Sequence, residues 1–128
     1  MNYDEKELNE EQLLPLKQTA GAVLVTAGAG SGKTRLLTYR VAYLIEKIGV
    51  SPYNILAITF TNKAAGEMKE RIAGMVYGAD RVWISTFHSM CAKILRMDID
   101  ALYPFTKDFS IYSESDSDKV LKDVLLEY

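Results

Sequence analysis

The sequence predicts an α/β fold built on a parallel sheet. Three short apolar runs lack the polar alternation of half-exposed strands, which indicates that both faces of each run are buried. An amphipathic segment follows each run, and alternating strands and helices of this kind form right-handed crossovers between parallel strands. The predicted strands are Val23–Thr26, Ile55–Phe60 and Arg81–Thr86.

Composition indicates the class of protein. The 128 residues suffice for one domain with a core, and a content of 48% apolar and 25% charged residues is ordinary for a soluble globular chain. The net charge of −2 predicts no broad attraction to nucleic acid, so such contact needs a local site. The single cysteine excludes an intrachain disulfide. With no membrane-length apolar run and an acidic start unlike a signal peptide, we expect a cytoplasmic protein without membrane contact.

A helix within residues 3–20 precedes the first predicted strand, and the segment Ala27–Thr34 follows that strand and opens the next helix. Its sequence, AGAGSGKT, has the form of a phosphate-binding loop, in which glycines let backbone N–H groups turn around a polyphosphate. The start of the helix adds free N–H donors and the positive end of its dipole. Ala27 stands where the motif has glycine, a small change that keeps the backbone N–H. The alternative is a glycine-rich turn without a ligand.

Two side chains complete the predicted nucleotide site. Lys33 would place a positive charge on the β- and γ-phosphates, and the Thr34 hydroxyl would ligate Mg²⁺. The sequence therefore predicts a site for a nucleoside triphosphate, ATP, with Mg²⁺. The loop residues that would surround the phosphates are Ala27, Gly28, Ala29, Gly30, Ser31 and Gly32.

Helices are predicted after each of the three strands. The first runs from Lys33 to Ile48 and ends at Gly49, with Pro52 beyond. Its predicted buried face consists of Leu36, Leu37, Val41, Leu44, Ile45 and Ile48. The second is capped by Thr61 or Asn62 and directs Ala65, Met68 and Ile72 inward, and the third runs from about Phe87 past Leu95.

Polar turns follow the second and third predicted strands, at the sheet edge where ligands bind in open α/β folds. At Thr59–Lys63, the Phe60 ring could stack on a base while hydroxyls and the helix start hold phosphates; the alternative is a helix cap with Phe60 in the core. At Thr86–Ser89, His88 could bind a phosphate or a base, or could cap a helix. The candidate residues for single-stranded nucleic acid are Thr59, Phe60, Thr61, Asn62, Lys63, Thr86 and His88.

The pattern changes after residue 98. A short extended piece at Phe109–Tyr112 precedes a helix with an apolar face, formed by Val120, Leu121, Val124 and Leu125. The polar and acidic residues of Ser113–Asp118 could include a catalytic carboxylate. Their position directly before a helix favours an N-cap cluster instead.

Four segments, in order over residues 8–98, resemble the N-terminal part of superfamily 1 DNA helicases of the UvrD/Rep/PcrA type. Leu8–Gln12 (LNEEQ) is similar to the adenine-reading Q motif, with Glu10 in place of the usual proline. The other three resemble the family's phosphate loop, motif Ia and motif Ib; they are Ala27–Arg35, Ile55–Arg71 and Thr86–Ser89.

The resemblance implies a fold and residue roles. Residues 1–98 would form part of a RecA-like P-loop NTPase domain, and residues 99–128 would begin a helical insertion. Gln12 would hydrogen-bond the adenine edge and Arg35 would stack on its face. The whole enzyme would use ATP and Mg²⁺ to move 3′ to 5′ along single-stranded DNA, entering from a 3′-tailed duplex.

In the family that the chain resembles, further parts of the motor come after the helical insertion. They include an Asp-Glu pair for Mg²⁺ and a second motor lobe with an arginine finger, so we expect a fragment that binds nucleotide weakly and is inactive alone. Family strands would lie between the first predicted strand and the other two, so a rearranged sheet, a swapped dimer or partial disorder is expected. The alternative function is a non-catalytic helicase-like module that binds nucleotide or DNA.

Overall fold

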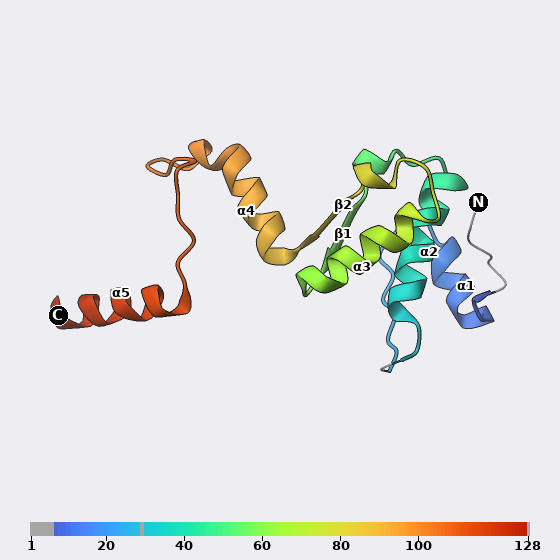
Figure 1. Cartoon of the computed structure of the whole chain (residues 1–128), viewed down its shortest axis with the longest axis horizontal. Helices are drawn as coiled ribbons and strands as arrows, with labels where there is room; N and C mark the ends of the chain where they lie inside the picture. The colour runs from blue at the N-terminus through green and yellow to red at the C-terminus, as the bar shows by residue number, and fades with distance from the viewer. Residues whose placement is uncertain (1–6, 29, 128) are drawn as a thin grey trace. The chain divides into compact units, whose positions relative to one another are not determined.

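The computed structural model describes residues 7–28 and 30–127, which form two compact units that meet between Met90 and Cys91. Figure 1 labels the α-helices and the two strands of the described residues, and three short 3₁₀ helices lie between them. In chain order the elements are α1 (Glu10–Lys17), α2 (Lys33–Glu46), η2 (Pro52–Asn54), β1 (Leu56–Thr59), α3 (Asn62–Ala73), η3 (Ala79–Arg81), β2 (Trp83–Thr86), α4 (Phe87–Asp98), η4 (Ile99–Ala101) and α5 (Glu114–Glu127). The units meet within α4, whereas the motifs predict a boundary at residue 98; that boundary stays a prediction.

Two of the three predicted strands form, and they are parallel as predicted. β1 and β2 pair directly, with Leu56 opposite Trp83 and Thr59 opposite Thr86. The crossover helix α3 buries Ala65, Met68 and Ile72 against this sheet, which confirms the predicted inward face. The structure is therefore α/β with a two-stranded parallel sheet.

The strand predicted at Val23–Thr26 is wrong for the described chain. Residues 22–28 are neither helix nor strand, and Leu24 is 89% exposed. A strand is stable only when a neighbour pairs with its backbone N–H and C=O groups. Among the described residues, β1 and β2 pair only with each other, so no neighbouring strand pairs with Val23–Thr26.

Helix α2 begins at Lys33 as predicted and ends before Gly49, which has a left-handed φ of 77°. The backbone N–H of Val50 returns to the carbonyl of Leu44 at 2.9 Å, a hydrogen bond that closes the helix end. Its buried face differs from the predicted one, because it packs on both α1 and α3. Leu36 and Val41 are buried, whereas Leu37 and Ile48 are 38% and 47% exposed.

Two clusters of buried side chains hold the first unit together. The larger lies between the sheet, α2 and α3, and is formed by Val41, Ala42, Ile55, Ala57, Ala65, Met68, Ile72, Val76, Ala79, Val82 and Ile84. The smaller joins α1 to α2 and consists of Leu8, Leu16, Leu36 and Tyr39. The second cluster fixes α1 beside the start of α2, where the phosphate-binding loop ends.

In the second unit, the residues before α5 form an N-cap as predicted. The Ser113 hydroxyl accepts the Asp116 N–H at 3.2 Å, and an Asp116 carboxylate oxygen accepts the Ser113 N–H at 2.9 Å. The predicted apolar face of α5 is exposed, with Leu125 at 67%. No helix in the described ranges is long and apolar enough to cross a membrane.

Candidate nucleotide and nucleic-acid site

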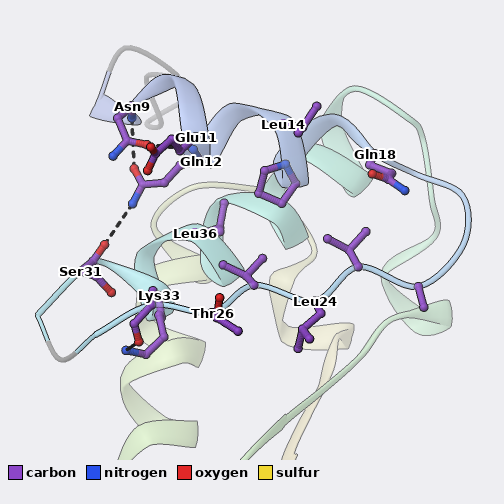
Figure 2. A pocket seen from close by; sticks show the side chains of 15 residues that line it. Asn9, Glu11, Gln12, Leu14, Gln18, Leu24, Thr26, Ser31, Lys33 and Leu36 are labelled. Carbon is purple, nitrogen blue, oxygen red and sulfur yellow. Dashed lines mark hydrogen bonds between the residues drawn. The ribbon is translucent and has the colours of Figure 1, made fainter.

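The N-terminus of α1 carries the predicted adenine-reading residue. Asn9 and Gln12 form a capping box: the Asn9 side chain accepts the Gln12 N–H at 2.8 Å, and the Gln12 amide oxygen accepts the Asn9 N–H at 3.1 Å. The Gln12 Nε2 then donates to the main-chain carbonyl of Ser31 at 3.2 Å. Figure 2 shows Gln12 between Asn9 and Ser31, so one side chain connects α1 to the phosphate-binding loop.

The phosphate-binding loop turns back to place Lys33 against its own backbone. The Lys33 ammonium donates to the carbonyls of Ala27 at 2.8 Å and Gly28 at 2.5 Å. Gly30 and Gly32 have left-handed φ values of 75° and 83°, which a Cβ would strain. Gly32 is also the N-cap of α2, so the loop ends at the free N–H groups of a helix N-terminus. Ala29 lies outside the described residues.

Residues from α2 contact the segment that precedes α1. Arg35 donates to the main-chain carbonyl of Glu7 at 3.5 Å, and the Tyr39 hydroxyl donates to the Glu7 carboxylate at 2.5 Å. Gln12 therefore lies in the first turn of α1 and Arg35 in the first turn of α2. These are the two residues predicted to bind the base. The Thr34 side chain is exposed at the first turn of α2, where an added ligand could reach its hydroxyl.

A cavity of about 550 Å³ opens between α1, the segment 22–27 and the loop. Gln12, Ser31 and Lys33 line it together (Figure 2). Its volume is in the range of small-molecule sites, and polar groups for a base and a cation for phosphate converge on it. No group of three or more His, Cys, Asp or Glu residues that could hold a metal ion occurs in residues 7–28 and 30–127.

A second candidate surface lies at the carboxyl ends of β1 and β2. Thr59 and Thr86 are opposite each other in the sheet, so the residue after each, Phe60 and Phe87, projects from neighbouring positions. The two rings lie 6.3 Å apart between centroids at an interplanar angle of 62°. Phe60 is 93% exposed, which excludes the alternative in which its ring packs in the core.

The hydroxyls at these strand ends make local hydrogen bonds. Thr61 caps α3 by accepting the Ala64 N–H at 3.1 Å, and Thr59 donates to the carbonyl of Thr61 at 3.0 Å. Thr86 donates to the Ser89 hydroxyl at 3.0 Å and accepts its N–H at 3.3 Å. The predicted cap of α3 therefore exists at Thr61, whereas at the start of α4 the oxygen that accepts a backbone N–H belongs to Thr86 rather than to His88. The remaining candidates, Asn62, Lys63 and His88, are exposed.

Phe87 is not among the residues predicted to contact nucleic acid; its predicted role was to begin a helix. The signal was present, because the dipeptide Thr-Phe stands at both points where a predicted strand passes into a helix. The register of the two strands is needed to see that these rings are neighbours. Thr59 pairs with Thr86, so Phe87, which is 51% exposed, lies beside Phe60.

The chain is similar in sequence to known proteins. A sequence model of the family described as "UvrD/REP helicase N-terminal domain" matches residues 8–128. The chain is 53% identical over 126 residues to proteins named ATP-dependent DNA helicase PcrA from Staphylococcus aureus (strain Mu50 / ATCC 700699) and Staphylococcus epidermidis (strain ATCC 12228 / FDA PCI 1200). Each match covers 98% of this chain and 17% of the relative, so the chain spans about a sixth of the length of these relatives.

Proposed function

The chain belongs to the UvrD/REP helicase family, and from this membership we propose that it is the N-terminal ATP-binding region of an ATP-dependent DNA helicase. The observation that carries the proposal is the phosphate-binding loop, which ends at an open helix N-terminus with the Lys33 ammonium inside its turn. A cation and free N–H groups at one place are what a polyphosphate requires.

Each residue of the nucleotide site has a proposed role. Gln12 and Arg35 bind the base, the roles that the resemblance to the family implies; Gln12 donates to the Ser31 carbonyl and Arg35 to that of Glu7. Lys33 leaves the loop carbonyls and pairs with the phosphates, and Thr34 ligates Mg²⁺. When bound, ATP with Mg²⁺ supplies the phosphoanhydride whose hydrolysis drives movement. Since the carboxylate pair expected for Mg²⁺ is not among these residues, we propose that the 128 residues alone do not turn over ATP measurably.

For the ends of β1 and β2 we propose contact with single-stranded DNA. The exposed Phe60 ring stacks on a base, and the α3 N-terminus with Asn62 and Lys63 holds phosphates. His88 adds a donor from the neighbouring strand end. The net charge of −2 gives no general attraction to DNA, so affinity is concentrated at this edge. We also propose that the helicase moves 3′ to 5′ along single-stranded DNA and acts in the cytoplasm.

We also propose that Val23–Thr26 becomes a strand when neighbouring strands of the same motor lobe pair with it. The apolar, β-branched sequence suits a central strand, and no neighbouring strand pairs with it within the described residues. A swapped dimer of the 128-residue chain would supply the pairing from a second copy. Sedimentation of the purified chain distinguishes the two, because a monomer excludes the swap.

The main test measures ATP hydrolysis by the intact protein with and without single-stranded DNA. Lys33→Ala should lower DNA-stimulated turnover by roughly two orders of magnitude, as expected for loss of a preorganised charge on phosphate. Lys47→Ala, at the opposite end of α2, should leave turnover unchanged. Equal activity of the Lys33→Ala protein would overturn the assignment. Unwinding of 3′-tailed but not 5′-tailed duplexes tests the direction.

A further inference from the structure

Gln12 contacts the phosphate-binding loop itself, in addition to facing the cavity where a base would bind. We propose that Asn9 and Gln12 are positioning residues for this loop, so that Gln12 contributes to affinity for the triphosphate as well as to recognition of the base. The inference rests on the proposed function, since it concerns the same nucleotide. Its basis is the continuous chain of hydrogen bonds from Asn9 through Gln12 to Ser31 (Figure 2).

The capping box fixes the orientation of the Gln12 amide. Its oxygen accepts the Asn9 N–H at 3.1 Å, so its NH₂ group lies on the other side of the planar amide and donates to Ser31. The position of α1 itself is firm, because the helix is anchored by Leu16, which is fully buried, and by Leu8 against α2. Arg40 adds a hydrogen bond from α2 to the carbonyl of Pro15.

The loop needs such an external contact. Ser31 lies between Gly30 and Gly32, whose left-handed backbones impose little restriction of their own. Its contacts inside the loop run to a single carbonyl, that of Gly28, from its hydroxyl at 2.6 Å and its N–H at 3.4 Å. Gln12 reaches the loop from α1, outside both the loop and α2.

The contact sets the direction of a phosphate donor. In a trans peptide, the Ser31 C=O and the Gly32 N–H lie in one plane and point in opposite directions. When Gln12 draws the carbonyl toward α1, the Gly32 N–H points away from α1 and cannot rotate freely. This N–H belongs to the last loop residue before α2, where a phosphate would accept it. Loss of the Gln12 contact therefore loosens the phosphate cradle even for a ligand that has no base.

The test compares two ligands on the intact protein by calorimetric titration: ATP with Mg²⁺, and inorganic tripolyphosphate with Mg²⁺, which has no base. Gln12→Met should lower affinity for tripolyphosphate roughly two- to tenfold, and for ATP by at least as much. Asn54→Met removes an exposed side-chain amide from a residue that does not line this cavity, and should alter neither affinity.

Variants of Asn9 separate positioning from simple loss of structure. Asn9→Ala removes the cap and should weaken tripolyphosphate binding, whereas Asn9→Ser keeps a capping oxygen and should restore it. If Gln12→Met weakens ATP but leaves tripolyphosphate unchanged, Gln12 reads the base only and the inference is wrong while the proposed function stands. If Asn9→Ser binds as weakly as Asn9→Ala, the role of the cap is overturned. If the unaltered protein binds neither ligand, the proposed function itself fails.

Discussion

The phosphate-binding loop and the ends of β1 and β2 share one sequence pattern, yet they are built differently. In each, an apolar run leads through a polar turn into a helix. β1 and β2 form because they pair along four residues, from Leu56 opposite Trp83 to Thr59 opposite Thr86. The run at 23–26 leads into its loop without pairing, although α2 still begins at Lys33. Local residues therefore set the turn and the helix start, while a strand depends on its neighbour.

This difference divides the candidate site into a local and a long-range part. The loop is held by contacts within a few residues, such as Lys33 to the carbonyls of Ala27 and Gly28, and by Gln12 from α1. The neighbouring rings of Phe60 and Phe87 exist only because two strands 27 positions apart in sequence are in register. Substitutions that disturb the sheet should therefore affect the ring pair of Phe60 and Phe87 more than the phosphate-binding loop.

The largest expected effect contrasts the core under the sheet with the unpaired run. Ile72→Ala creates a cavity at a fully buried position and should lower the free energy of unfolding by about 2–5 kcal/mol. Leu24→Ala, at a side chain that is 89% exposed, should cost no more than about 0.5 kcal/mol. Urea unfolding of the 128-residue chain, followed by the fluorescence of Trp83, its single tryptophan, measures both. A cost above about 2 kcal/mol for Leu24→Ala would mean that the run is a buried strand.

The next effect concerns DNA binding at the ends of β1 and β2, the part of the site that depends on long-range pairing. Phe60→Ala should weaken binding of single-stranded DNA to the intact protein by about 1–3 kcal/mol, the usual contribution of an aromatic ring stacked on a base. Tyr77→Ala removes another aromatic ring of similar exposure, 91% against 93%, away from the strand ends, and serves as the matched control. Anisotropy of a labelled oligonucleotide reports both. If both variants lost the same affinity for the oligonucleotide, Phe60 would not be a specific contact for DNA.

A smaller effect tests whether helix starts are local. Thr61→Ala removes the oxygen that accepts the Ala64 N–H at 3.1 Å and should lower the free energy of unfolding by about 1 kcal/mol. Thr61→Ser keeps that oxygen and should recover most of the loss. The same urea experiment applies. If Thr61→Ser were as unstable as Thr61→Ala, the threonine methyl group rather than the cap would explain the effect.

The features that the sequence could predict are encoded within a few residues. The cap at Thr61, the end of α2 at Gly49 and the capping cluster at Ser113 all agree with prediction, because a short side chain or a glycine satisfies neighbouring backbone groups. The buried face of α3 was equally predictable, since Met68 and Ile72 lie one turn apart on a helix with one apolar stripe.

What the sequence could not predict depends on distant partners. The apolar stripe of α2 is wide enough to face several directions, and contact with α1 and α3 decides that Tyr39 is buried while Leu37 is exposed. Residues 23–26 have the composition of a buried strand, but composition supplies no pairing. Phe87 became a candidate only through the register of β1 and β2. In each case the missing information is a long-range contact.

The smallest effect is a pH dependence at a helix start that lies far in sequence from any strand. The Ser113 hydroxyl and then its N–H donate to the exposed Asp116 carboxylate and hold its pKa below the usual 3.8. Because the folded pKa lies below the unfolded one, the charged cap stabilises the start of α5 above pH 3.8, and this contribution disappears as the pH falls through the folded pKa. Carbon-13 NMR titration of Asp116 should find this lowered pKa, and Ser113→Ala should raise it toward 3.8. A pKa at or above that value in the unaltered chain would contradict a persistent cap. A lowered value would show that the local hydrogen bonds between Ser113 and Asp116 persist at the start of α5, where no strand of the described chain is near in sequence.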